Sequence, residues 1–424
     1  MKEHQSNRRD FVKQTATLTA LAASSKWASG AFAGSDETLK VGLIGCGGRG
    51  SGAVVQALTA DKNTKLIAMA DVFKDRIESS LDGIKGSDVA DRVDVPEDRQ
   101  FVGFDAYKPV TDLCDVVVLT STPHFRPEHL TYAVEKGKHV FAEKPVATDP
   151  AGIQTVRKAV DLAKEKNVCL VSGLCWRYFI PRVETMKRVA DGQIGDIVAI
   201  ETTYNSGGVW PPRKRRSEVD SDMAYQLRNW YYYTWLSGDH IVEQAVHAID
   251  TMAWAMGDEP PTLVWGSGGR QVRTQEMYGN IWDHFGLVYE YPNGVRGYHQ
   301  CRHWKGTDSR VQDYVLGSNG ICDVFGKSIS GPNAWAYEGE EKNMYQNEHD
   351  HLFAAIRRGE AVNDGEYMWK STLLGIMGRM AAYSGETITW EQAVNSELNL
   401  GPDKYEWGDA PEVVIAMPGK TKYT

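Results

Sequence analysis

The sequence lacks the features that mark several classes of protein. Only six of its 424 residues are cysteines and no two have C-x-x-C spacing, so a cysteine zinc site is not expected. It contains neither an internal repeat nor a low-complexity tract. Basic residues are in deficit, and the net charge of −9 argues against nucleic acid, whose phosphates require a basic face. A chain of this length with 42% hydrophobic residues is expected to form two soluble globular domains.

The first 33 residues predict an export signal rather than a folded element. The segment Asn7-Arg8-Arg9-Asp10-Phe11-Val12-Lys13 resembles a twin-arginine signal. The apolar run that follows, residues 16–23, is too short and too polar to span a bilayer permanently. Ala31-Phe32-Ala33 offers a small-x-small cleavage site, so we expect a mature chain from about Gly34 and a periplasmic location. A disordered basic tail is the alternative.

Export by that route has a consequence for the cysteines and for any cofactor. Because the twin-arginine route carries folded proteins, a cofactor would be inserted before export. Folding in the reducing cytoplasm also means that the six cysteines need not form disulfides.

A glycine-rich turn follows the first predicted strand, residues 39–44. The turn is Gly45-Cys46-Gly47-Gly48-Arg49-Gly50, and residues 51–60 after it have a helical pattern. In this setting Gly45 makes the tight turn, Gly47 admits a pyrophosphate, and Gly50 lets the helix pack closely on the strand. The N–H groups of the helix N-terminus then face the phosphates. The pattern predicts an NAD(P)-binding Rossmann domain over residues 34–150, with Gly48 and Arg49 also at the cofactor.

An acidic residue stands where the second strand of such a domain ends. Residues 65–70 are apolar and lead into Asp71, about where a ribose-binding carboxylate belongs. Asp71 would accept hydrogen bonds from the adenosine 2′-hydroxyl and repel a 2′-phosphate. NAD is therefore favoured, while nearby Arg49 and Arg76 keep NADP possible.

Further strands predict a parallel sheet and the place of its ligand crevice. Apolar runs at residues 115–120, 139–142 and 168–172 alternate with helical segments, which is typical of an α/β fold with right-handed crossovers. Ligands bind at the carboxyl ends of such strands. The residues expected to line the crevice are Thr122, Pro123, His124, Glu143 and Lys144. Lys144 can stabilise the alkoxide that forms when a hydroxyl is oxidised.

A second group of ionisable residues lies in Gly238–Met256, which has the pattern of one helix. His240, Glu243, His247 and Asp250 recur at spacings that place them on one face. Neutral His247 is suited to accept a hydroxyl proton. Glu243 could orient the imidazole or hold sugar hydroxyls, and Asp250 could do the same or be structural.

Two other interpretations of this stripe stay open. A metal site built from His240, Glu243 and His247 has suitable ligand types, although our expectation is that no metal is bound. The other interpretation is a buried polar network without a catalytic role.

Aromatic residues crowd into one stretch, residues 210–235. Such side chains pack on sugar rings, as Trp235 would, but they also fill cores and oligomer interfaces. The basic run Arg213-Lys214-Arg215-Arg216 is most simply a solvated loop.

From about Leu39 to Ser396 the chain resembles the Gfo/Idh/MocA oxidoreductases, typified by glucose-fructose oxidoreductase and inositol dehydrogenase. The resemblance rests on the glycine turn, Asp71, Glu143-Lys144-Pro145 and the acid-x-x-x-His helix. Two patches agree with it, Gly173-Leu174-Cys175-Trp176-Arg177-Tyr178 and Gly378-Arg379-Met380-Ala381-Ala382-Tyr383.

The resemblance implies a catalytic pair, Lys144 and His247, with Arg177 and Tyr178 near the substrate. It also implies a second α+β domain, residues 151–396, with an open, mostly antiparallel sheet that packs in homodimers or homotetramers. The last helices could return to the first domain, and residues 397–424 form a tail.

One departure from the family pattern bears on the substrate. Glu243 and Ala245 stand where dehydrogenase members commonly carry Asp and Gly, so a shifted or different substrate is plausible. The leading hypothesis is an NAD-dependent oxidoreductase acting on a hydroxyl of a sugar or glycoside, with a bound and recycled cofactor. The alternatives are a glycoside hydrolase, lyase or epimerase that uses bound NAD in a net-neutral cycle, and a non-catalytic sugar-binding protein.

Overall fold

The first half of the molecule is a parallel sheet between two layers of helices. The computed structural model describes residues 37–422, so the predicted export signal lies outside the described residues. The sheet has the order β3-β2-β1-β4-β5-β6, which is that of dinucleotide-binding folds. Its strands are β1 (Leu39–Ile44), β2 (Thr64–Asp71), β3 (Gln100–Val102), β4 (Val116–Leu119), β5 (His139–Ala142) and β6 (Leu170–Ser172). Every neighbouring pair is parallel.

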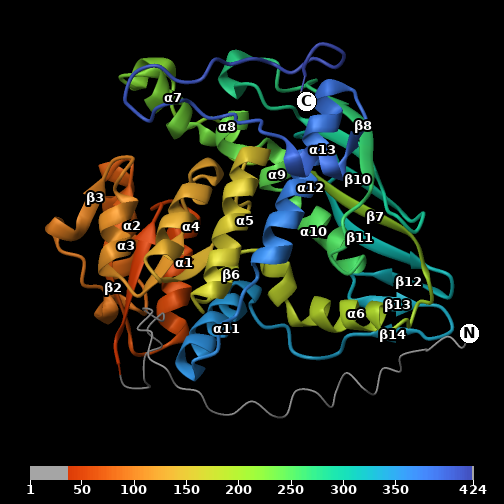
Figure 1. Cartoon of the computed structure of the whole chain (residues 1–424), viewed down its shortest axis with the longest axis horizontal. Helices are drawn as coiled ribbons and strands as arrows, with labels where there is room; N and C mark the ends of the chain where they lie inside the picture. The colour runs from red at the N-terminus through yellow and green to blue at the C-terminus, as the bar shows by residue number, and fades with distance from the viewer. Residues whose placement is uncertain (1–36, 423–424) are drawn as a thin grey trace, which may run out of the picture.

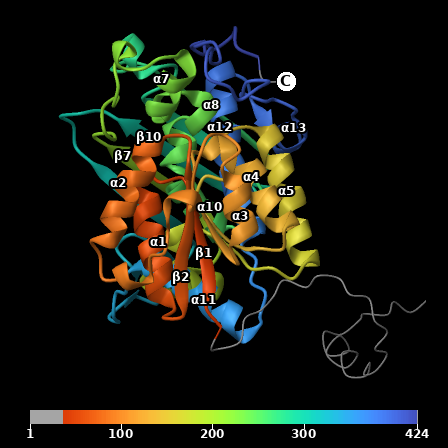
Figure 2. The same cartoon turned by 90° about the vertical axis from the view of Figure 1, so that its left-hand side faces the viewer.

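The central strands β1, β4 and β5 are buried on both faces, as their near-continuous apolar sequences predict. The helices of the layers are α1 (Gly48–Ala60), α2 (Lys74–Lys85), α3 (Tyr107–Leu113), α4 (Arg126–Glu135), α5 (Pro150–Glu165) and α11 (Met344–Arg358). One face packs against α1, α2 and α11, and the other against α3, α4 and α5 (Figure 2). Since α5 and β6 complete the layers, the parallel sheet extends past residue 150, to Ser172.

The second half contains a nine-stranded sheet in the order β14-β13-β12-β11-β7-β10-β9-β8-β15 (Figure 1). Its strands are β7 (Ile197–Ser206), β8 (Leu263–Gly269), β9 (His284–Glu290), β10 (Arg296–His303), β11 (Arg310–Gly317), β12 (Gly320–Asp323), β13 (Ser328–Ser330), β14 (Trp335–Ala336) and β15 (Ile388–Thr389). All pairs are antiparallel except β7 with β10. The predicted fold class, a Rossmann sheet followed by an open, mostly antiparallel sheet, is confirmed.

Within the part of the chain that the structure describes, helices cover one face of the nine-stranded sheet and not the other. They are α6 (Ile180–Ala190), α10 (Val246–Ala255), α12 (Gly365–Ser384) and α13 (Trp390–Asn395). The row Val264, Tyr289, Gly297, Ile200 faces this layer and is buried or closely packed. The neighbouring row, which includes Trp265 and Tyr298, lies on the opposite face, where both side chains are exposed. Across the described residues no helix is long and apolar enough to cross a membrane.

The helix predicted over Gly238–Met256 is wrong in one respect: it is two helices, α9 (His240–Glu243) and α10. Asp239 has a positive φ of 71° and caps α9. The N–H of Ala245 then donates to the carbonyl of His240, five residues back, so the helical ladder is interrupted at Gln244 and Ala245. The four ionisable residues therefore do not share one face.

Two segments join the halves above the carboxyl ends of the parallel strands. Helices α7 (Asp222–Arg228) and α8 (Thr234–Ser237) project from the second half, and the tail from residue 397 runs across α7 (Figure 1). In addition, the fully buried Arg379 of α12 donates to the carbonyls of Thr148 and Gly238, at 2.8 and 2.9 Å. Arg379 thereby ties the segment after Lys144 to the start of α9.

Candidate active site

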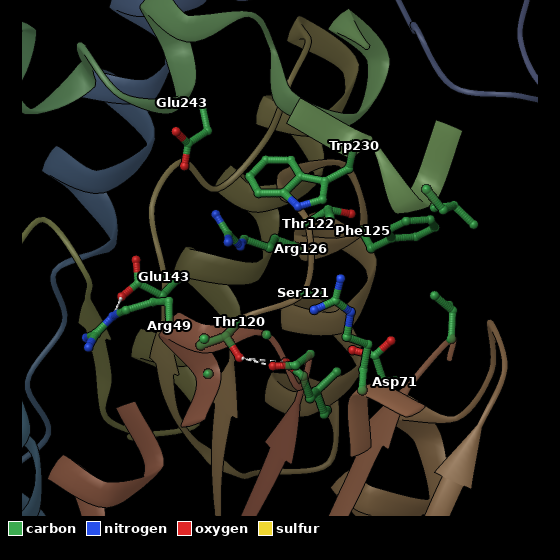
Figure 3. Close-up of a pocket in the computed structure, with 18 of the residues that line it drawn as sticks. Arg49, Asp71, Thr120, Ser121, Thr122, Phe125, Arg126, Glu143, Trp230 and Glu243 are labelled. Carbon is green, nitrogen blue, oxygen red and sulfur yellow. Dashed lines mark hydrogen bonds and ion pairs between the residues drawn. The ribbon is translucent and has the colours of Figure 1, made fainter. Parts of the chain in front are cut away.

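A cavity of about 490 Å³ lies where the two halves meet. Its floor is the glycine turn and the ends of the parallel strands, and its roof comes from β7, the segment after it, and the α9–α10 junction. Figure 3 shows Asp71 and Glu143 on opposite sides of the floor, with Glu243 and Trp230 above them. A volume of this size is typical of small-molecule and cofactor sites.

The three glycines of the turn have the geometry that their assigned tasks require. Gly45 has φ +95°, and a Cβ there would lie 2.3 Å from the backbone nitrogen of Ser121. A Cβ on Gly50 would lie 2.1 Å from the carbonyl oxygen of Gly45, so only glycine permits this approach. A Cβ on Gly47 would meet nothing within 4 Å. The backbone there is open to the cavity, next to the N-terminus of α1, as a pyrophosphate needs.

Asp71 stands at the far end of the same floor. Its carboxylate accepts hydrogen bonds from the N–H groups of Cys46 and Phe73, at 2.8 and 3.0 Å. Burial raises its pKa, against the lowering effect of these bonds and of Arg76. Each oxygen retains a second lone pair for a ribose hydroxyl. The turn and Asp71 together fit a dinucleotide without a 2′-phosphate.

The segment after β4 enters the cavity only in part. Thr122 lines it, but Pro123 and His124 are not among its lining residues. The ring of His124 hydrogen-bonds the hydroxyl of Tyr405, at 2.7 Å, and packs against Trp235. Because residues 123–125 form a short 3-10 helix, successive side chains point in different directions.

The partly exposed Arg49 pairs with the buried Glu143 beside the turn. The Nε of Arg49 donates to Glu143, while its other nitrogens donate to Gln56 and Glu348, each at 2.7 Å. Burial would raise the pKa of Glu143, but Arg49, Lys144 and Arg126 together lower it. Glu143 is thus ionised and fixed, so Lys144 follows a rigid strand end.

Lys144 is held by Glu243. Its Nζ lies 3.1 Å from the Oε1 of Glu243 and also donates to the carbonyl oxygen of that residue. Both side chains are mostly buried and line the cavity. Glu243 therefore contacts the lysine and not, as one sequence-based alternative has it, the imidazole of His247.

His247 lines the same cavity from the first turn of α10. Its ring stacks on Trp176 with a centroid distance of 5.1 Å, and the guanidinium of Arg182 covers the same indole at 3.7 Å. Burial lowers the pKa of His247 well below its ordinary value, and Lys144, Arg182 and Arg49 lower it further. The imidazole is consequently neutral and able to accept a proton.

Three predicted substrate contacts lie elsewhere. Arg177 pairs with Asp250 and Asp258, and Tyr178 donates to Asp364. None of these residues lines the cavity. Arg177 and Tyr178 follow Trp176 in a 3-10 helix, Cys175–Tyr178, in which each residue projects about 120° from the last. The members of this motif at the cavity are Gly173 and Cys175.

His240 and Trp235 also point away from the cavity. The ring of His240 pairs with Asp239 at 2.9 Å and packs on Phe285, while the indole N–H of Trp235 donates to Gln226 at 2.6 Å. The metal alternative therefore loses His240 as a ligand. Within residues 37–422 no group of three or more His, Cys, Asp or Glu side chains is arranged to hold a metal ion.

The cavity contains residues that sequence reasoning missed or gave another task. They are Arg126, Tyr204, Trp210, Arg213, Trp230, Gln244 and Tyr345. Trp210 and Trp230 belong to the predicted aromatic cluster, whereas Arg213 belongs to the run interpreted as a solvated loop. Tyr204 and Gln244 stand next to predicted elements, but no local pattern distinguishes them from structural residues.

Fold and site together define a dinucleotide-binding oxidoreductase scaffold with a second, sheet-containing domain over the nicotinamide end. Residues 39–174 match the oxidoreductase family with an NAD-binding Rossmann fold, Gfo/Idh/MocA, and residues 183–322 match the Gfo/Idh/MocA C-terminal domain. The chain belongs to this family, as its resemblance predicts, and the first half is an NAD-binding domain.

Individual relatives are distant. Inositol 2-dehydrogenase 3 of Saccharopolyspora erythraea is 25% identical over 266 residues, which are 61% of this chain and 65% of the relative. A glycosyl hydrolase family 109 protein of Porphyromonas gingivalis is 27% identical over 181 residues, 41% of this chain and 36% of that protein. The chain thus matches less than two thirds of the length of either. The crystal structure of aldose-aldose oxidoreductase from Caulobacter crescentus has the same fold, with a TM-score of 0.64, 17% identity, and coverage of 83% of this chain and 100% of that one.

Proposed function

We propose that this protein is an NAD-dependent oxidoreductase that acts on a hydroxyl group of a sugar or glycoside and keeps its cofactor between turnovers. The observation that carries the proposal is the position of Lys144 and neutral His247 in one cavity with the glycine turn. Inositol and aldose oxidoreductases among the similar proteins support the substrate class.

Each residue of the site has a separate task in this reaction. The N–H groups at the start of α1 would hold the pyrophosphate, and Asp71 the adenosine ribose. When bound, NAD accepts a hydride from the carbon that carries the reacting hydroxyl. Lys144 donates a hydrogen bond to the oxygen as it becomes negative, and His247 accepts the hydroxyl proton. Glu243 keeps the lysine ammonium in place.

Cofactor retention is supported by contacts that Arg228 and Trp407 make over the adenosine end of the cavity. Arg228 of α7 makes a bidentate pair with Asp75 at 2.7 and 2.6 Å, and its guanidinium covers Phe73 at 3.6 Å. Trp407 of the tail packs on Phe73 and Phe104, with centroids 5.6 and 5.1 Å apart. Both phenylalanines line the cavity, so NAD would leave only after these contacts break.

Retention is tested by the rate at which protein purified with its cofactor loses NAD(H) during dilution and filtration. Arg228→Ala and Trp407→Ala should each speed the loss roughly three- to tenfold, the size of an exposed ion pair with a cation–π contact in the first case and of aromatic ring contacts in the second. Arg358→Ala removes a comparable surface pair with Glu360 and should leave the rate unchanged. Rapid loss from the unmodified protein would refute retention.

Export to the periplasm is part of the same proposal. The twin-arginine pattern at Arg8 and Arg9 motivates it, and a held cofactor suits a compartment without a free NAD pool. Fractionation of cells that produce the full chain and an Arg8→Lys, Arg9→Lys variant is the test. The variant protein should stay in the cytoplasm; equal distribution of both proteins would overturn the export signal.

A homodimer or homotetramer is also proposed. Exposed Trp265 and Tyr298 on the uncovered face of the nine-stranded sheet, 43% and 44% accessible, support it. Light scattering after size-exclusion chromatography tests it, and Tyr298→Glu should shift the mass toward the monomer.

A second candidate is a glycosidase that oxidises and then re-reduces the sugar, so that no net redox change occurs. The similarity to a family 109 glycosyl hydrolase supports this second candidate. One experiment separates the two functions: the protein with bound NAD is incubated with aryl glycosides and with free sugars. Reduction of the cofactor that stops after one turnover supports the oxidoreductase. Continuous aglycone release without added NAD, abolished by Lys144→Ala, supports the glycosidase.

A further inference from the structure

A buried arginine lines the cavity without a carboxylate partner. Arg126, the first residue of α4, is 6% exposed. Figure 3 shows its guanidinium on the side of the cavity where Glu143 and Glu243 lie, away from Asp71. Its Nη1 donates to the carbonyl oxygen of Pro145 at 2.6 Å, which fixes the side chain. Its Nε is buried without a hydrogen-bond partner, and no group of residues 37–422 accepts from its Nη2.

The two carboxylates at this end of the cavity are already paired with other cations. Glu143 accepts from Arg49, and Glu243 accepts from the lysine that follows Glu143, at 3.1 Å. Among residues 37–422 no acidic side chain lies within ion-pair distance of Arg126. Burial lowers the pKa of Arg126 to about 10, against the raising effect of Glu143 and Glu243, so the guanidinium is charged at neutral pH. A buried cation without an anion is costly, so a bound group is expected to complete the pair.

The cofactor does not provide this anion. The pyrophosphate of NAD carries its negative charges at the glycine turn, where the N–H groups of α1 would bind it. A smaller pocket joins Gly47 and Gly48 of the turn to Arg76 and Arg213, so cations for the pyrophosphate are present at that end. At the other end the oxidised nicotinamide ring is itself positive, and its carboxamide is neutral. The anion that pairs with Arg126 must therefore come from the substrate.

We propose that Arg126 binds the carboxylate of an acidic sugar, such as a uronate, and thereby sets the substrate class of the site. The proposal rests on the proposed function, because the sugar occupies the cavity with its reacting hydroxyl at Lys144 and His247. A guanidinium forms charge-assisted hydrogen bonds with a carboxylate, and these are strong where water is excluded. The bond from Nη1 to the Pro145 carbonyl leaves the remaining N–H groups of Arg126 for the carboxylate.

The first test compares sugars that differ at one carbon, with the full chain and its bound NAD. The probe pairs are D-glucose with D-glucuronate and D-galactose with D-galacturonate, and reduction of the bound cofactor gives the half-saturating concentration of each. In at least one pair the uronate should half-saturate at a roughly ten- to hundredfold lower concentration, the value of a hydrogen bond to a charged group. Reduction by the neutral sugars with no advantage for either uronate would overturn the inference and leave the proposed function standing. If none of the four probes reduces the cofactor, the proposed function fails and this inference with it.

The second test removes the charge. Arg126→Gln keeps an N–H donor but leaves the carboxylate of a bound uronate without a cation. It should raise the half-saturating concentration of the uronate about 30-fold or more and that of the neutral partner less than about threefold. Arg157→Gln is the matched control, because Arg157 is exposed on α5 over Trp369, outside the cavity, and its loss removes the same charge. It should change neither value. A uronate preference that survives Arg126→Gln would refute the inference.

A binding measurement without turnover complements the kinetics. Protein whose cofactor has been reduced to NADH cannot oxidise the sugar, and the fluorescence of Trp210 and Trp230, which line the cavity, reports its binding. The uronate should bind the unmodified protein more tightly than its neutral partner does. Arg126→Lys keeps the charge in a less suitable shape and should retain part of this preference, so it decides the question if Arg126→Gln does not fold. Equal binding of uronate and neutral sugar by the unmodified protein would contradict the inference.

The amount of NAD that each purified variant contains distinguishes sugar binding from cofactor binding. Arg126→Gln should contain as much NAD as the unmodified protein. A loss of NAD, with equal effects on the uronate and on its neutral partner, would place Arg126 at the nicotinamide. That outcome would refute the inference and leave the proposed function standing.

Discussion

The two ends of the cavity are built by different means. At the cofactor end, one short segment of backbone makes the site, and its glycines are required because backbone must approach backbone or ligand. At the substrate end, side chains from the segment after β5, from β7, from the α9–α10 junction and from α10 converge from distant parts of the sequence. The first end depends on the path of the chain, and the second on the packing of two domains. Substitutions at the two ends should therefore have different effects on cofactor binding, turnover and stability.

The largest effect is expected from Lys144→Ala. Loss of the group that stabilises the reacting oxygen should lower kcat by about 10²- to 10⁴-fold, because hydrogen bonding to a developing charge contributes mainly in the transition state. NAD should remain bound, since the cofactor end is untouched. Fluorescence of the reduced cofactor measures turnover, and release of NAD on denaturation measures occupancy. A variant that loses both would show that the two ends are not separable.

A substitution at Arg177 tests whether this residue binds substrate or stabilises the fold around the substrate end of the cavity. Its side chain is 9% exposed and pairs with Asp250 and Asp258. Arg177→Met leaves two carboxylates uncompensated, so the free energy of unfolding should fall by about 3–5 kcal/mol. Urea denaturation provides the measurement. Arg358→Met, at an exposed pair, should change stability by less than about 0.5 kcal/mol. A normal stability with a raised KM would instead place Arg177 at the substrate.

Gly50→Ala should weaken the binding of NAD and leave the substrate end of the cavity unchanged. The added methyl group would lie 2.1 Å from the carbonyl of Gly45, and relief of that overlap is expected to cost about 1–3 kcal/mol of NAD affinity, or roughly 5- to 150-fold. Gly52→Ala is the matched control one half-turn along α1, where a Cβ meets nothing nearer than 3.9 Å. Calorimetric titration of protein freed of its cofactor measures both affinities. Equal binding by the two variants would contradict the assigned role of Gly50.

Acidification should lower the free energy of unfolding because the buried histidines cannot take up protons in the folded protein. Burial lowers the pKa of His129 and His299 to about 3, below the ordinary value near 6.5. As the pH falls below about 6.5 the unfolded chain takes up protons that the folded chain cannot. Between pH 6.5 and 5 each of these residues should therefore lower the free energy of unfolding by about 2 kcal/mol.

Denaturation curves at several pH values test this sign. His299→Gln should reduce the slope of stability against pH by about one proton. Tryptophan fluorescence reports mainly on the second half, because every tryptophan of residues 37–422 lies beyond β6 in the sequence. A stability that rises on acidification would contradict the prediction.

The sequence was informative where a function needs a particular backbone. The strand, glycine turn and helix over residues 39–60 are one local unit, so spacing alone predicts their structure. Lys144 and His247 were found because one follows a strand end and the other belongs to a short motif. Periodicity predicts a substrate role for Asp250 and His240 because it gives a direction along a helix and not the partner across the interface. Arg177 is placed near the substrate by the family resemblance, which does not show its partners either. Asp258 binds Arg177, and Asp239 binds His240. No sequence pattern indicates that either aspartate has this partner. The sequence does not single out Tyr204 and Gln244 for the same reason, since they reach the cavity only when β7 and the α9–α10 junction come together.

The single guanidinium of Arg379 has a consequence for how substrate enters. It bonds both to the carbonyl of Thr148, four residues after Lys144, and to that of Gly238, at the entry to α9. A hinge opening between the halves would have to strip this buried cation of its bond to Thr148, which is costly. Substrate would therefore enter through the opening of the cavity, where Trp210 and Arg213 are exposed. The width of this opening, and not a movement of the two domains, would then limit the size of the sugar that can bind.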